Sequence, residues 1–444
     1  MVNINSIHKI RYWLIILFFV ALPFERIFTF EFASYTIKLS YIFGIILLLY
    51  FLCQVISKKI NISLYKEELY LLLFALLAVL STLWSIDWPR SLVVSLMILL
   101  SVLIFYALRR LVDPDLRQKL FSLIIVIGFL VSLFALWQFF IDKTSLSQFS
   151  YLREQYKSAV FGFPRVQSTF LEPLYLANFL LIPIFLGIYF EISNFSTRIY
   201  QISRHSFPPK AESACDRRNL ASSRLFAIRL FLLVTATAFF LTLSRGAYLA
   251  LAISLVLFFG MMLFTRTNVS KLIKPLLILI LSFGIAVLCI LSVGGTSGLK
   301  KYFGHAAVND ITTGESVIDR KDTMSIAISQ FYHHPFGIGA GAFGALPEFK
   351  GDIPLQGYQT VNNLYLEILV EEGFLGIILF ILFLVYYLVN LAREGVKNKL
   401  FLIMSLSLIS ALLIQYLFFS TLYIMYVWVI LAMLSPKLAQ NHKS

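Results

Sequence analysis

Runs of about 20 apolar residues recur along the whole chain, and they constrain its fold more than any other feature of the sequence. A helix of that length crosses the roughly 30 Å hydrocarbon core of a bilayer. Of the 444 residues, 59% are hydrophobic and 14% are charged, whereas soluble domains carry roughly 25% charged residues. The sequence therefore predicts an all-α polytopic membrane protein, with residues 1–444 forming a single integral membrane domain.

The apolar runs predict about 12 transmembrane helices. Their expected limits are residues 12–30, 39–56, 68–84, 91–108, 120–141, 173–192, 226–243, 247–264, 275–293, 374–390, 400–415 and 418–435. An even number of spans leaves both termini on one side of the membrane. No cleavage site of small residues follows the first run, so we expect a retained helix there rather than a signal that is removed.

Lysine and arginine predict the orientation. Most of the 37 Lys and Arg residues fall on the side that holds the N-terminus. Cytoplasmic loops carry such an excess, so this side, with both termini, is predicted to be cytoplasmic. The same bias explains the net charge of +14, and no nucleic-acid partner is predicted. The three cysteines show no paired spacing, so we expect neither a disulfide nor a metal site.

Residues 294–363 form the longest hydrophilic stretch and are predicted to be one large extracytoplasmic loop. Polar groups are costly inside a bilayer, so the chemistry of an apolar chain is expected in its aqueous segments or at the helix ends beside them. Apolar Ile318, Met324 and Phe331 recur at helical spacing and predict a short amphipathic helix over residues 317–331.

A second amphipathic turn is predicted at the end of this loop. Asn363, Glu367 and Glu371 fall on one face at helical spacing, and Leu364 is apolar. Carboxylates at the outer end of a span can act as a general base or hold arginines in place. The alternative is a solvated helix start with no chemical role.

Arg245 lies between two apolar runs with hardly any loop between them, at the predicted outer boundary of the membrane. Its side chain could simply extend to the interface, as long basic side chains do. Alternatively it could bind an anion, because a guanidinium stays charged and its donors match a phosphate. Ser244 and Gly246 beside it would let a headgroup approach the backbone closely.

Two further arginines lie in the predicted extracytoplasmic segments. Arg320 belongs to the amphipathic helix, where Asp319 and Asp322 are near enough in sequence to make a plain surface ion pair with it. Arg165 lies in residues 142–172, a shorter outer segment, just before a predicted helix start. Both are candidates for contact with an anionic group.

Three glycines follow the amphipathic helix. Gly339, Gly341 and Gly344 match the spacing of the dinucleotide-binding fingerprint. That fingerprint requires a strand before it and a helix after it within a βαβ unit. The segment here lies in the outer loop of a membrane protein, so a tight, closely packed turn is predicted instead.

Three blocks together resemble the O-antigen ligase and O-antigen polymerase superfamily, bacterial polytopic membrane glycosyltransferases. They are residues 241–247 (Leu-Thr-Leu-Ser-Arg-Gly-Ala), the helix from Arg320 that ends in His-Pro-Phe-Gly-Ile-Gly, and residues 363–373 with Asn-Leu-Tyr-Leu-Glu. The resemblance is strongest over residues 235–380, which contain the 294–363 loop.

The resemblance implies a reaction at the outer face of the bacterial inner membrane. A glycan leaves an undecaprenyl diphosphate carrier and is transferred to a hydroxyl of a glycan or lipid acceptor. By position, Arg245 and Arg320 would bind the diphosphate, and Arg165 is a third candidate. Such arginines stabilise the charge that develops on the leaving group. No cofactor or metal is implied, because the lipid diphosphate already activates the sugar.

One position departs from the family pattern. Ligases typically carry a histidine, proposed as the general base, where this chain has Asn362. An amide cannot take up the proton, so Glu371, Glu367 or a nearby histidine would have to do so, or little base catalysis is needed. The change favours a polymerase, or transfer to another acceptor.

Two other classes remain open from the sequence. A transporter or flippase of a lipid-linked sugar would place ionisable residues deep within its spans, and almost none are found there. A non-catalytic partner in a polysaccharide assembly complex would need the chain but not its arginines.

Overall fold

The computed structural model describes residues 4–27, 29–32, 35–60, 62–158, 162–193, 214–306, 315–349, 359–395 and 398–435. These residues contain fourteen α-helices and one two-stranded ribbon. Nine of the helices are long and apolar enough to cross a membrane. The predicted helical, multi-pass membrane protein is therefore confirmed. The loop predicted over residues 294–363 is described only in part, because residues 307–314 and 350–358 lie outside the described ranges.

The three remaining predicted spans correspond to α1 (Ile4–Ala21), α16 (Lys399–Gln415) and α17 (Met425–Leu434). None is among the nine candidate spans. With 10 residues, α17 rises only about 15 Å, half of a hydrocarbon core. The first predicted span is wrong in its second half: α1 ends before Pro23, which cannot continue a helix. A short antiparallel ribbon follows, with Phe30 opposite Ile37.

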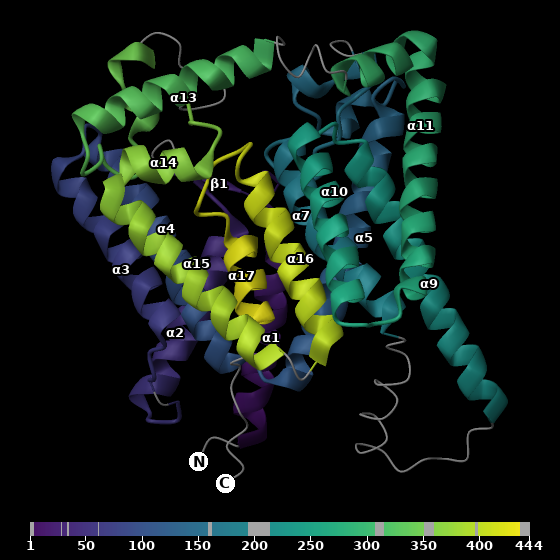
Figure 1. Ribbon diagram of the computed structural model, residues 1–444, viewed down its shortest axis with the longest axis horizontal. Coiled ribbons are helices and arrows are strands. Elements are labelled where there is room, and N and C mark those ends of the chain that lie inside the picture. The colour runs from purple at the N-terminus through teal and green to yellow at the C-terminus, as the bar shows by residue number, and fades with distance from the viewer. Residues whose placement is uncertain are drawn as a thin grey trace. The chain divides into compact units, whose positions relative to one another are not determined.

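The chain divides into two compact units. The first comprises residues 1–120, 306–397 and 412–444. Besides α1 and α17 it contains β1 (Phe30–Phe32), β2 (Tyr35–Ile37), α2 (Leu39–Ile56), α3 (Lys66–Ser81), α4 (Trp88–Leu111), α13 (Glu315–His333), α14 (Leu364–Glu371) and α15 (Gly373–Gly395). Helix α3 packs against α4 and α15, and α4 also contacts α2 and α17. Figure 1 shows α13 and α14 together at one end of this unit.

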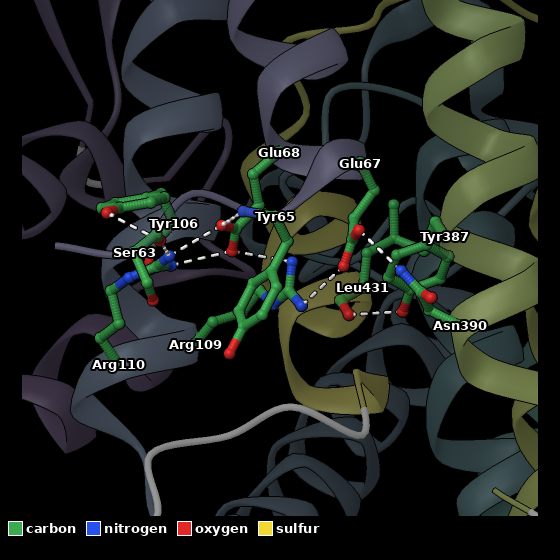
Figure 2. Close-up of polar contacts among 10 residues, drawn as sticks. All are labelled: Ser63, Tyr65, Glu67, Glu68, Tyr106, Arg109, Arg110, Tyr387, Asn390 and Leu431. Atoms are coloured by element: carbon green, nitrogen blue, oxygen red, sulfur yellow. Dashed lines mark hydrogen bonds and ion pairs between the residues drawn. The ribbon is translucent and has the colours of Figure 1, made fainter. Parts of the chain in front are cut away.

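At the start of α3, a buried ion network joins three helices of the first unit (Figure 2). Arg109 of α4 lies 3.0 Å from a Glu67 oxygen and 2.8 Å from a Glu68 oxygen. Arg110 contacts both oxygens of Glu68, at 2.8 and 2.7 Å. Asn390 of α15 donates to the other Glu67 oxygen at 2.7 Å. Two positive and two negative side chains therefore balance one another where burial would otherwise be costly.

The second unit comprises residues 121–305 and 398–411. It contains most of α5 (Pro114–Ile141) and of α16, together with α7 (Pro173–Ile192), α9 (Ala214–Phe240), α10 (Arg245–Phe264) and α11 (Ile273–Ala306). Helix α7 is buried along nearly its whole length and packs against α9 and α10. Gly128 of α5 meets Pro183 within α7, where a β-carbon would lie 2.6 Å from the proline ring.

Helix α11 bends close to the predicted start of the outer loop. The span predicted to end at residue 293 is followed, after a kink, by a second helical stretch that reaches Ala306 and that the sequence did not predict. Its path is broken at Gly295, whose φ of 61° and ψ of −162° are not helical. Glycine tolerates this conformation because it has no β-carbon.

Candidate functional site

In the second unit, a buried glutamine fixes the segment that carries Arg165. The side-chain oxygen of Gln138, Oε1, accepts the backbone N–H groups of Gln167 and Ser168, at 3.3 and 2.7 Å. Its amide nitrogen donates to the Ser168 carbonyl at 3.1 Å. Ser168 has a φ of 51°, so the chain turns sharply there. These bonds from α5 hold the loop in a single path next to Arg165.

Arg165 lies beside the start of α10. Its Nε and one terminal nitrogen each lie 3.4 Å from the Thr242 carbonyl oxygen, and its guanidinium sits 5.7 Å from the ring centre of Tyr156. Arg245 is the first residue of α10. Burial, together with the positive charge of the nearby Arg245, lowers the pKa of Arg165. The fold thus brings two of the predicted arginines close to one another.

Ser244 adds a hydroxyl to this arginine pair. It precedes Arg245 and is only 4% exposed. Its Oγ has no hydrogen-bond partner among the described residues. Buried polar groups are nearly always hydrogen-bonded, so an orphaned hydroxyl beside two cationic groups suits a ligand oxygen.

Arg320 lies in the first unit, on α13, and is partly exposed. The helix expected over residues 317–331 is present and slightly longer, although the side chain of Asp319 lies outside the described residues. One turn after Arg320, the Thr323 hydroxyl is within hydrogen-bonding distance of the carbonyl oxygens of Arg320, at 3.0 Å, and of Val361, at 3.3 Å. This contact ties α13 to the segment that contains Asn362.

Helix α14 carries the predicted carboxylates. The Asn363 side chain caps its start by accepting the backbone N–H groups of Tyr365 and Leu366, both at 3.1 Å. Asn362, just before, has a φ of 56°, a left-handed conformation that asparagine adopts more readily than most residues. Glu367 lies next to it, since the backbone N–H of Val361 donates to a Glu367 oxygen at 3.4 Å.

The glycine segment forms the expected tight turn against α14 and against the α3–α4 connection. Gly337, Gly339 and Gly341 all have positive φ. A β-carbon at Gly339 would lie 2.3 Å from the Ser85 hydroxyl oxygen, and one at Gly337 would lie 2.2 Å from a backbone oxygen of Glu371. Only glycine fits such approaches without a shift of the neighbouring atoms.

Glu371 holds this turn in place. Its two carboxylate oxygens accept the backbone N–H groups of Gly341, at 2.6 Å, and of Phe343, at 3.2 Å. Its backbone carbonyl accepts the N–H of Gly339 at 2.9 Å. With its oxygens engaged and 7% exposure, Glu371 is placed to position the turn.

A narrow cleft lies between the turn, α4 and α14, and its space is continuous with solvent. Arg90, Glu367, Glu371, Glu372 and Tyr423 are among the residues that line it. The Arg90 Nε donates to the Gly341 carbonyl at 2.6 Å, which fixes this arginine at the cleft wall.

Burial controls the ionisation of the cleft carboxyls. It raises the pKa of Glu367 to about 7, and burial together with the Glu367 charge raises the pKa of Glu371 to about 8. Burial and the other two carboxylates raise the pKa of Glu372 as well. Like charges in a desolvated place disfavour the ionised form, so protons are retained here near neutral pH.

The predicted site residues therefore fall into two groups. Arg165 and Arg245 come together in the second unit. Asn362, Glu367 and Glu371 come together in the first unit, which also holds Arg320 on α13. Among the described residues, no cluster of His, Cys, Asp and Glu side chains could hold a metal ion.

Three contributing residues were not predicted: Arg90, Gln138 and Glu372. Arg90 follows Trp88-Pro89 and directly precedes the span predicted over 91–108, so its place at a helix end could have been predicted. Gln138 is a polar residue inside an apolar run, which is costly unless its hydrogen bonds are satisfied. Glu372 is adjacent to a predicted carboxylate, but its burial depends on tertiary packing.

Fold and site together define a multi-pass helical membrane protein with grouped arginines and carboxyls near the ends of its helices. Residues 230–381 match the family model described as O-antigen ligase. This part of the chain is therefore similar to O-antigen ligases, and the predicted resemblance over residues 235–380 is confirmed. No curated protein sequence matches the chain.

Proposed function

We propose that this protein is a glycosyltransferase of the bacterial inner membrane. It transfers or polymerises a glycan carried on undecaprenyl diphosphate, at the outer face, and both of its termini are cytoplasmic. The O-antigen ligase domain over residues 230–381 supports the reaction class. The bias of Lys and Arg towards one set of loops supports the orientation.

The proximity of Arg165 to Arg245 is the observation that supports this region as the binding site for the diphosphate of the glycan donor. Two like charges brought together favour an anion between them, and the buried Ser244 hydroxyl nearby has no hydrogen-bond partner among the described residues. A diphosphate fits, because each guanidinium offers several donors to its oxygens. As the glycosidic bond breaks, charge grows on the leaving diphosphate, and donors already in place stabilise it most in the transition state. Arg320, in the first unit, stays a separate candidate for contact with an anionic group because of its position in the family pattern.

Glu367 is the base that the geometry favours for the acceptor hydroxyl. It is hydrogen-bonded to the residue before Asn362 and lines the cleft. A raised pKa near neutrality suits a base that must take a proton and then release it. Both Glu371 oxygens already accept backbone N–H groups, so Glu371 is assigned to positioning the glycine turn.

The donor assignment is tested by changing the arginines in cells and following the lipid-linked glycan. We expect Arg165→Ala and Arg245→Ala each to reduce transfer by about 100-fold or more, the scale seen when one such donor is removed. The lipid-linked donor should then accumulate. Lys300→Ala is the matched control, because Lys300 is an exposed basic residue of α11. Normal polymer length and attachment in well-expressed Arg165 and Arg245 variants would refute the proposal.

A further inference from the structure

The cleft beside α14 contains a carboxyl group that the proposed reaction does not use. Glu372 is 3% exposed yet lines the cleft. Among the described residues, no hydrogen bond from another residue to its carboxyl is found, whereas Glu371 and Glu367 both accept backbone N–H groups. Within the described residues the Glu372 carboxyl is hydrogen-bonded by its own backbone N–H alone, which leaves further hydrogen-bonding capacity at the cleft wall for a ligand.

The cleft wall is assembled from separate parts of the first unit. Arg90 comes from α4, Gly341 from the glycine turn, and Glu367 from α14, while Thr421 and Tyr423 belong to the segment before α17. The hydrogen bond from Arg90 Nε to the Gly341 carbonyl joins α4 to the glycine turn. The hydrogen bond from the Gly341 N–H to the Glu371 carboxyl joins the same turn to α14. Polar groups that converge from several elements are typical of the walls of binding sites.

The chemistry of the wall selects the class of ligand. Buried carboxyls with raised pKa values hold protons near neutral pH, so they can both donate and accept hydrogen bonds. Arg90 contributes donors, and Tyr423 contributes a ring and a hydroxyl. Sugar hydroxyls also donate and accept. A carboxylate or phosphate would lose its hydration beside three carboxyl groups with one arginine to offset its charge, and it would repel each of these carboxyls that ionises.

We propose that this cleft is the binding site for an uncharged sugar unit of the acceptor glycan, with Glu372 and Arg90 as its recognition residues. This inference rests on the proposed function for the identity of the acceptor. It adds where the acceptor binds and which sugars the cleft excludes. Glu367, on the same wall, is then next to the bound sugar, as a base for one of its hydroxyls must be.

Binding can be measured without any transfer reaction. The full chain in lipid nanodiscs is titrated with methyl glucoside, methyl N-acetylglucosaminide and methyl glucuronide, followed by saturation-transfer NMR. We expect the neutral sugars to give a signal at least tenfold stronger than the glucuronide. Glu372→Leu should abolish that signal, whereas Glu372→Gln, which keeps donor and acceptor atoms, should retain most of it. Glu154→Gln is the control, on an exposed carboxylate of the other unit.

Arg90→Gln provides a second test in case the Glu372→Leu variant unfolds, and it should weaken neutral-sugar binding about tenfold, a difference of about 1.4 kcal/mol. Equal signals from all three sugars, or signals unchanged in both Glu372→Leu and Arg90→Gln, would overturn the inference. Loss of sugar binding in these variants while the Arg245→Ala protein still makes normal polymer would instead leave the sugar site standing and refute the proposed donor assignment. If no sugar binds while Arg245→Ala shows the expected loss of transfer, the sugar site is refuted and the donor assignment is kept.

Discussion

The buried ion network at the start of α3 allows a stability prediction with a defined magnitude. Arg109→Leu removes contacts of 3.0 and 2.8 Å from a side chain that is only 1% exposed. Removing one member of a buried ion pair costs about 3–5 kcal/mol, because the remaining charge is left without compensation. Glu68 keeps Arg110 and Glu67 keeps Asn390, so we expect about 3 kcal/mol, the lower end of that range.

The measurement is denaturant unfolding in detergent micelles, followed by tryptophan fluorescence, with Trp428 buried near the same helices. Arg393→Leu, an exposed arginine of α15, serves as control and should change the free energy of unfolding by less than about 0.5 kcal/mol. The double variant Arg109→Leu with Glu67→Gln should recover most of the loss, because one positive and one negative charge then remain. A loss below about 1 kcal/mol for Arg109→Leu, the scale of an exposed pair, would refute the reasoning.

Three further predictions concern the site. The rate of transfer should increase as the pH rises through about 7, because the raised pKa of Glu367 keeps this base protonated and inactive below that pH. Glu367→Gln should lower the rate by about 10²–10⁴-fold and flatten the pH profile of initial rates. Gly339→Ala should lower the free energy of unfolding by about 1–3 kcal/mol, because its φ is 104° and the new methyl group would meet Ser85, as chemical denaturation would show. Gln138→Leu leaves the Ser168 N–H unpaired, so KM for the donor should rise more than kcat falls, and equal effects on both would count against a positioning role.

The fold class could be predicted from the sequence because hydrophobic length is a direct physical constraint on a membrane helix. The ends of the helices were harder to predict from the sequence. The predicted span over 12–30 runs past Pro23 into the β1–β2 ribbon, and the second stretch of α11 after the kink at Gly295 was not predicted. Hydropathy reports burial in lipid and not backbone geometry, so neither the end of α1 nor the stretch after the kink follows from the apolar runs.

The parts of the site differ in how much of each could be predicted from the sequence. Arg165 and Arg245 were predicted separately as anion-binding candidates, but their proximity depends on the Gln138 bonds and on the path through Ser168, which no local pattern encodes. The raised pKa values of Glu367 and its neighbours likewise come from tertiary burial. Sequence can propose ionisable residues at helix ends, whereas their pairing and protonation require the packed structure.

The asparagine at position 362 illustrates how the geometric and chemical demands on one position can separate. The backbone there is left-handed, with a φ of 56°, directly before the Asn363 cap of α14. Asparagine satisfies that conformation at low cost, but its amide cannot accept a proton. The Val361 N–H brings the Glu367 carboxylate to the same turn, where burial keeps its pKa near neutrality. In the proposed mechanism, a base supplied from the first turn of α14 removes the need for an ionisable side chain at 362. Asn362→His should then leave the rate within about threefold, whereas Glu367→Gln should not.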